Sequence, residues 1–195
     1  MENQNKEEKI TIVSGLPRSG TSMMMQMLRS GGMDLVTDEI KKADEDNPRG
    51  YFELERVKKL KEDKFWLSEC VGKAIKVISV FLFDLPAQYH YKIIFMQREM
   101  EEVLASQRVM LQRRGEKGDG TGEEEMAGKF VEHLKQVETW LARQTCLTVL
   151  YLKYNKLIKD PLYYSKIVNN FLGGALNEKN MAEAIERSLY RQQKN

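Results

Sequence analysis

The residues with the clearest chemistry lie in one short stretch near the N-terminus, VSGLPRSGTSMMM, at positions 13–25. Gly15 and Gly20 are separated by four residues, and the hydroxyl pair Thr21-Ser22 follows directly. A β-branched run, Lys9–Ser14, precedes this stretch and predicts a buried strand, while the methionines after it favour a helix. Backbone N–H groups at the start of a helix lie at the positive end of its dipole and bind anions. The pattern therefore predicts a phosphate-binding loop.

This loop departs from the ATP-binding version at one position. That version has a lysine directly after the second glycine, where this sequence has Thr21, and a basic side chain stands three places earlier as Arg18. No predicted strand ends in a carboxylate placed to hold Mg²⁺. Arg18 offers a planar, permanently charged fork to phosphate oxygens. The loop therefore suits a terminal phosphate without a metal, and a nucleotide kinase or NTPase with an altered loop is the alternative.

A second stretch, YKIIFMQREMEEVLASQ, pairs a strand with a helix. Arg98 follows the apolar run Tyr91–Gln97, and Ser106 lies about two helical turns further on. Because parallel sheets bind ligands at the carboxyl ends of their strands, Arg98 is expected beside the first loop. A solvated face of an amphipathic helix is the alternative interpretation of Arg98 and Ser106.

GLPRSGTSMMMQML closely resembles the 5′-phosphosulfate loop of sulfotransferases that use 3′-phosphoadenosine 5′-phosphosulfate (PAPS). The arginine and serine of the second stretch are similar to the motif that holds the 3′-phosphate in that family. The resemblance implies PAPS as co-substrate, its 3′,5′-bisphosphate (PAP) as product, and no metal. The implied donor-binding residues are Pro17, Arg18, Ser19, Gly20, Thr21, Ser22, Arg98 and Ser106.

A third stretch, YNKLIKDPLYYSKIVNNFLGG at residues 154–174, is similar to the segment that closes the core of many bacterial sulfotransferases. Asp160-Pro161 is typical of a helix start and Gly173 of a helix end, so the segment is expected to be structural. The resemblance runs from about Lys9 to Gly174. The sequence lacks the late Arg-Lys-Gly segment that covers the 3′-phosphate in cytosolic relatives.

Sulfuryl transfer to a hydroxyl needs a base, together with charge stabilisation by Arg18. His90 precedes a strand, at the wrong end of the sheet, and His133 lies among charged residues on a helix, which predicts a surface position. Glu53 follows a loop that could return to the site, and Glu39 stands 21 residues beyond Arg18, as the base does in tyrosylprotein-type enzymes. Glu53 is preferred to Glu39, although each could be a solvated surface carboxylate.

The elements that must position these residues alternate along the chain. Further strands are expected at Lys73–Val80 and from Cys146 to Tyr154. Helices are expected at 51–64, from Arg98 to Arg114 with an apolar stripe, at 126–143, and in two segments split by Gly173-Gly174. This order predicts an α/β three-layer sandwich with a central parallel sheet of about four to five strands, and the resemblance implies a P-loop NTPase-like fold. Residues 114–125 are expected to form a mobile loop and residues 1–8 a flexible N-terminus.

Length and composition limit the possible domain number, partners and location of the protein. The 195 residues suit a single domain, 1–195, and the net charge of +2 gives no argument for nucleic acid. The sequence contains no run of about 18 apolar residues, so it does not predict a membrane span. Two distant cysteines and the polar first eight residues favour the cytoplasm. The acceptor is expected to be a hydroxyl of a small molecule, sugar or lipid. Its binding site is expected to be open or to be completed by a second subunit. The non-enzymatic alternative is a nucleotide-binding module without turnover.

Overall fold

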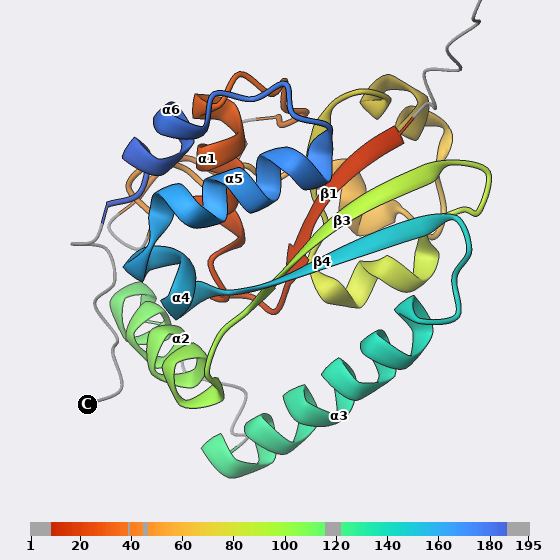
Figure 1. Ribbon diagram of the computed structural model, residues 1–195. Coiled ribbons are helices and arrows are strands. Elements are labelled where there is room, and N and C mark those ends of the chain that lie inside the picture. Colours follow the sequence, from red (N-terminus) through yellow and green to blue (C-terminus); the bar gives the residue numbers. More distant parts are fainter. Residues whose placement is uncertain (1–8, 39, 45–46, 116–121, 187–195) are drawn as a thin grey trace, which may run out of the picture.

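The computed structural model describes residues 9–38, 40–44, 47–115 and 122–186. Its centre is a parallel sheet of four strands, β1 (Lys9–Gly15), β2 (Ala74–Lys76), β3 (His90–Gln97) and β4 (Leu147–Lys153). The strand order is β2-β1-β3-β4, with β1 and β3 in the middle (Figure 1). The predicted parallel α/β sheet is confirmed, at the lower end of the expected strand number.

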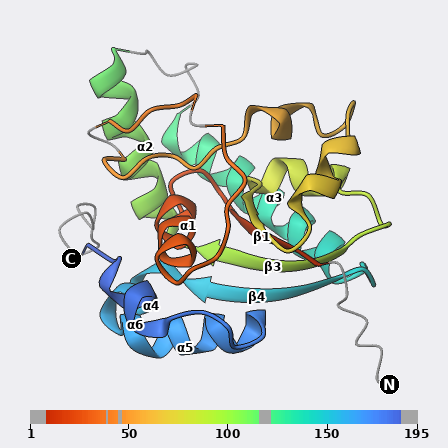
Figure 2. The ribbon, with the colours of Figure 1, turned by 90° about the horizontal axis from the view of Figure 1, so that it is seen from above.

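Helices cover both faces of the sheet, which makes three layers (Figure 2). One face carries α1 (Thr21–Ser30), α4 (Tyr154–Lys159), α5 (Pro161–Leu172) and α6 (Glu178–Glu183), packed around a methionine-rich core. The other face carries α3 (Glu123–Leu141) and three 3₁₀ helices, η1 (Glu55–Lys59), η2 (Phe65–Cys70) and η3 (Ser79–Asp84). The predicted three-layer sandwich is therefore the observed architecture.

The two central strands are apolar on both sides because both of their faces are covered. Ile12 and Ile93 point into the core beneath α3 and the 3₁₀ helices, whereas Val13 and Ile94 point into the core beneath α1 and α5. All four side chains are fully buried. Continuous β-branched runs of this kind are typical of buried parallel strands, which is why β1 and β3 were predictable.

Two predicted elements between β1 and β3 are wrong. Residues 51–64 do not form one helix, because the chain is extended up to Leu54 and then makes only the short η1. Gly50 and Phe52 have φ angles of 94° and 51°, which a right-handed helix excludes. The expected strand Lys73–Val80 is reduced to β2, because the chain turns away after Lys76 and enters η3.

The helix after β3, α2 (Met100–Arg114), projects beyond the sheet (Figure 2). Of the predicted apolar stripe, Val103 alone is fully buried. Val109 and Met110 are half-buried and line a cavity instead of the core. Part of the stripe is therefore a cavity wall, which sequence periodicity cannot distinguish from a core-facing surface.

The other boundaries differ less. α5 begins with the Asp160 side chain accepting a hydrogen bond from the Tyr163 N–H and ends at Gly173 with φ 115°, as predicted. α3 begins at Glu123, three residues earlier than expected, because three glutamates in its first turn favour the helix dipole. Of the expected mobile loop, residues 116–121 lie outside the described ranges, as do residues 1–8.

Candidate active site

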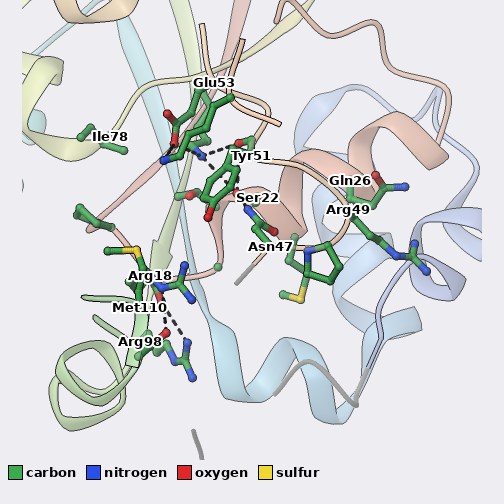
Figure 3. Close-up of a pocket in the computed structure, with 18 of the residues that line it drawn as sticks. Arg18, Ser22, Gln26, Asn47, Arg49, Tyr51, Glu53, Ile78, Arg98 and Met110 are labelled. Atoms are coloured by element: carbon green, nitrogen blue, oxygen red, sulfur yellow. Dashed lines mark hydrogen bonds and ion pairs between the residues drawn. The ribbon is translucent and has the colours of Figure 1, made fainter. Parts of the chain in front are cut away.

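A cavity of about 530 Å³ opens at the carboxyl ends of the central strands (Figure 3). β1 runs into the phosphate loop there, and β3 ends immediately before Arg98. The chain passes from β1 to β2 on one side and then returns across β1 to β3 on the other. This reversal of direction is the point at which open α/β sheets bind ligands.

The loop between β1 and α1 has the backbone geometry of an anion-binding concavity. Arg18 and Gly20 adopt left-handed conformations, with φ angles of 69° and 99°. A Cβ atom at Gly20 would overlap the ring of Tyr154, so only glycine fits that position. The N-cap residue of α1 is Gly20, which has no side chain to cap the first N–H groups of the helix.

Arg18, Arg98 and Ser106 converge on this concavity. Arg18 Nε donates to Ser106 Oγ at 2.9 Å, and Arg98 Nη1 donates to the backbone oxygen of Arg18 at 3.1 Å. Figure 3 shows both arginines on the same side of the cavity. The two predicted motifs are therefore brought together, and two guanidinium groups at one place favour a ligand with several negative charges.

Arg98 is more firmly fixed than the sequence indicates. Its side chain is only 7% exposed, and Nε is 2.9 Å from Glu102 Oε2. The guanidinium also lies 4.5 Å from the centre of the Tyr154 ring. Glu102 balances part of the charge, and the ring and carboxylate together hold the guanidinium in place.

The hydroxyl groups of the loop differ in what they contact. Ser19 Oγ donates to the Leu16 backbone oxygen at 2.7 Å, which braces the loop from within. Ser22 Oγ donates to the Tyr51 backbone oxygen at 3.2 Å and accepts from Asn47 Nδ2 at 2.8 Å. Both serines thus hold the loop in shape. Ser22 also lines the cavity, together with Pro17 and Thr21, whereas Ser19 does not.

Lys76 is a cavity residue that sequence reasoning missed. It ends β2, and its Nζ donates to the Tyr51 backbone oxygen at 2.6 Å and to Ser22 Oγ at 3.3 Å. Burial lowers the pKa of Lys76 to about 8, although the nearby Glu53 carboxylate raises it. The available signal was a lysine inside the apolar run KAIKVISV, at the carboxyl end of a strand.

Glu53 lies at the cavity, as predicted, and is paired with two lysines. Its Oε1 is 3.1 Å from Lys41 Nζ and 3.5 Å from Lys76 Nζ. Phe52 has a φ of 51°, a conformation that costs a non-glycine residue free energy and that directs the following carboxylate towards the site. Glu39, the other predicted base, lies outside the described residues.

The two histidines lie away from this cavity. His90 begins β3, at the opposite end of the sheet from Arg98. His133 was expected on the surface, but its Nε2 is 2.9 Å from the Oγ of Ser79 and its ring meets Phe83 edge to face. Burial lowers the pKa of His133. It packs α3 against η3.

The far wall of the cavity is formed by α1 and the C-terminal segment. Met23, Gln26 and Ala184 line it, and Arg49 pairs with Glu186 across it. Tyr154 lies between this wall and Arg98. Burial raises the pKa of Tyr154, so its hydroxyl is protonated at neutral pH. This wall therefore combines apolar side chains with a charged pair.

Two further findings concern the described part of the chain alone. No group of three or more histidine, cysteine, aspartate or glutamate side chains is placed to hold a metal ion there. None of its helices combines the length and apolar character that crossing a bilayer requires.

A four-stranded parallel sheet with helices on both faces, a glycine-containing loop after β1 and an arginine after β3 define a P-loop-like α/β fold. The chain belongs to the sulfotransferase domain family, whose model matches residues 8–195. The family supports transfer of a sulfuryl group as the general activity.

Solved structures support the fold. The sulfotransferase domain of the Synechococcus PCC 7002 olefin synthase aligns with a TM-score of 0.58 and 13% identity, over 97% of this chain and 82% of that one. A sulfotransferase from Alicyclobacillus acidocaldarius aligns with a TM-score of 0.50 and 14% identity, over 93% and 87%. Among curated proteins, Protein Ycf2 of Physcomitrium patens is 37% identical over 65 residues, which is 32% of this chain but 3% of that protein. The Ycf2 match covers too little of either chain to bear on activity.

Proposed function

We propose that this protein transfers a sulfuryl group from PAPS to a hydroxyl of a small molecule, sugar or lipid. The observation that carries the proposal is the contact between Arg98 and the backbone of Arg18, which places two cationic sites at the ends of neighbouring strands. One nucleotide with phosphates on both sides of its ribose fits such a pair. A single terminal phosphate would use the loop alone, and it would not account for a second, nearly buried arginine beside that loop.

In the proposed complex, the loop N–H groups, Thr21 and Arg18 hold the 5′-phosphosulfate. Arg98 and Ser106 hold the 3′-phosphate, since Ser106 Oγ accepts from Arg18 and keeps its own proton to donate. The adenosine lies towards Met23 and Tyr154. No metal takes part in this scheme, because the arginines and Lys76 supply the positive charge.

The reaction is an in-line displacement at sulfur. The acceptor oxygen forms a bond to sulfur while the bond from sulfur to the bridging oxygen breaks, and that electron pair leaves with PAP. Arg18 and Lys76 stabilise the charge that develops on the bridging oxygen. Glu53 accepts the acceptor's proton.

A transfer assay tests this proposal. The protein is incubated with PAPS and a panel of sugars, lipid alcohols and phenols, and both PAP and the sulfated product are measured. Equal amounts of PAP and sulfated product are expected for at least one acceptor class. PAP binding without transfer to any acceptor would favour a nucleotide-binding module, and thermal stabilisation by Mg²⁺-ATP but not by PAP would favour an altered kinase.

Replacing Arg98 with alanine is expected to weaken binding of PAP more than binding of adenosine 5′-monophosphate. The difference should be about 1.5–3 kcal/mol, as for a lost hydrogen bond to a charged group. Any loosening of the loop through the lost Arg18 contact should affect both ligands alike. Calorimetry with the two nucleotides measures the difference, and equal losses would show that Arg98 does not contact the 3′-phosphate.

The kcat/KM for PAPS is expected to fall as the pH rises above about 8. Burial lowers the pKa of Lys76 to about 8, while Glu53 raises it and Lys41 and Arg18 lower it. Below that pH the ammonium is charged and stabilises the donor. Above it, the fraction of Lys76 that is charged falls by about tenfold per pH unit, and kcat/KM falls with it. A pH profile of Lys76→Met should be lower and flat between pH 7 and 9.5. An unchanged decline in this variant would assign the titration to another group.

A further inference from the structure

Lys76 has all of its hydrogen-bonding capacity taken up by the chain itself. A lysine ammonium carries three N–H groups. Three acceptors surround the Nζ, namely the Tyr51 backbone oxygen at 2.6 Å, Ser22 Oγ at 3.3 Å and Glu53 Oε1 at 3.5 Å. The lysine side chain is only 5% exposed, so water has little access to it. A bound ligand can gain a contact with Lys76 only if one of these three contacts lengthens.

The three contacts differ in how readily they can be lost. The Tyr51 oxygen is backbone and gives the shortest contact, and Ser22 is fixed in α1 and held by Asn47 as well. Glu53 gives the longest contact, lies on a side chain that is 29% exposed, and has a second cation in Lys41. The Glu53 carboxylate is also the partner whose charge has the same sign as a phosphosulfate. Glu53 is therefore the contact that an incoming anion would displace.

We propose that, before the donor binds, the Glu53 carboxylate occupies the position on the Lys76 ammonium that the phosphosulfate later takes. When the phosphosulfate binds, it displaces Glu53 from Lys76, and Glu53 is then released to accept the acceptor's proton. This inference rests on the proposed function and adds an order of events to it. Ser22 links the two sites, because it lies in the first turn of α1, directly after the loop, and contacts Lys76. Lys41 remains on Glu53 and keeps the carboxylate at the cavity, with its own Nζ 3.9 Å from the centre of the Tyr51 ring.

The consequence is that the base becomes competent only in the donor complex. The Glu53 oxygen that contacts both ammonium groups has less room for the acceptor hydroxyl than an oxygen that contacts Lys41 alone. The Glu53 side chain is 29% exposed, so it has room to rotate when the contact with Lys76 is exchanged. Donor binding is thus expected to precede productive acceptor binding.

The test is the affinity for PAPS of a variant without the competing charge. Calorimetry without acceptor compares wild type, Glu53→Gln and the control Glu55→Gln, whose carboxylate contacts Lys58 instead. Glu53→Gln is expected to bind PAPS about two- to fivefold more tightly, the range of a partly exposed ion pair, with a smaller gain for PAP. Glu55→Gln should match wild type.

A double-mutant cycle separates competition for Lys76 from a general loosening of the loop. In the Lys76→Met background, Glu53→Gln should no longer tighten PAPS binding. Unchanged or weaker PAPS binding by folded Glu53→Gln, or the same gain with and without Lys76, would overturn the inference while leaving the proposed function intact. Failure of wild type to bind either PAPS or PAP would instead overturn the proposed function and this inference with it.

Discussion

Replacing Arg18 with alanine is expected to slow sulfate transfer at saturating PAPS by about 10²–10³-fold, the effect of removing one preorganised charge from a transition state. PAP binding should also weaken, by about tenfold or more, because the guanidinium contacts the ground-state anion as well. Both effects are expected because Arg18 lies in the loop and contacts Ser106, so in the proposed complex it would face the phosphate and the bridging oxygen together.

Single-turnover kinetics and calorimetry on Arg18→Ala measure the two effects separately. Arg29→Ala is a matched control, since Arg29 is an exposed arginine in the last turn of α1, the helix that follows the loop. It should leave both quantities within about twofold of wild type. A loss of affinity in Arg18→Ala without slower transfer would assign Arg18 to binding alone.

Replacing Glu53 with glutamine is expected to lower kcat by about 10²–10⁴-fold, the usual contribution of a general base. The amide keeps the shape of the side chain but cannot accept a proton at neutral pH. Affinity for PAPS should be retained or improved, so the defect should lie in kcat and not in the KM for the donor.

Steady-state kinetics with any accepted alcohol measures this effect, and thermal unfolding checks that the variant is folded. Glu55→Gln, two residues away, should keep kcat near wild type. A kcat of Glu53→Gln within about threefold of wild type would mean that another group takes the proton. Glu39, the other predicted base, would then be the next carboxylate to replace.

Much of the fold and part of the site follow from local sequence. β1 and β3 are continuous apolar runs, and the glycine spacing between Gly15 and Gly20 specifies a loop that few other residues permit. Arg98 was predictable because it directly follows β3, and the carboxyl ends of parallel strands meet at one edge. These features depend on neighbours in the chain and on one general rule of sheet topology.

The part of the cavity around Lys76 and Glu53 depends on contacts between distant segments, and so it was not predictable. Lys76 and Tyr51 are 25 residues apart, and their contact requires that the chain turn at Gly50 and Phe52 instead of forming the helix that its composition favours. The same turn places Glu53 at the cavity. A left-handed phenylalanine leaves no pattern in the sequence, because tertiary contacts maintain it.

The serines of the loop illustrate a different limit. The family resemblance implies that Ser19 and Ser22 contact the donor, and this stays a prediction. In the structure both hydroxyls are donated to backbone oxygens, of Leu16 and Tyr51. Residue type predicts that a hydroxyl will find a partner, but it does not predict which one.

The central claim is that one nucleotide joins the phosphate loop to Arg98. Calorimetric titration of the wild-type protein with PAP and with adenosine 5′-monophosphate tests it most directly, because the two ligands differ only in the 3′-phosphate. PAP is predicted to bind one site about 10- to 150-fold more tightly, which corresponds to a charged hydrogen bond of about 1.5–3 kcal/mol. Equal affinities, or no binding of PAP to the folded protein, would contradict the claim.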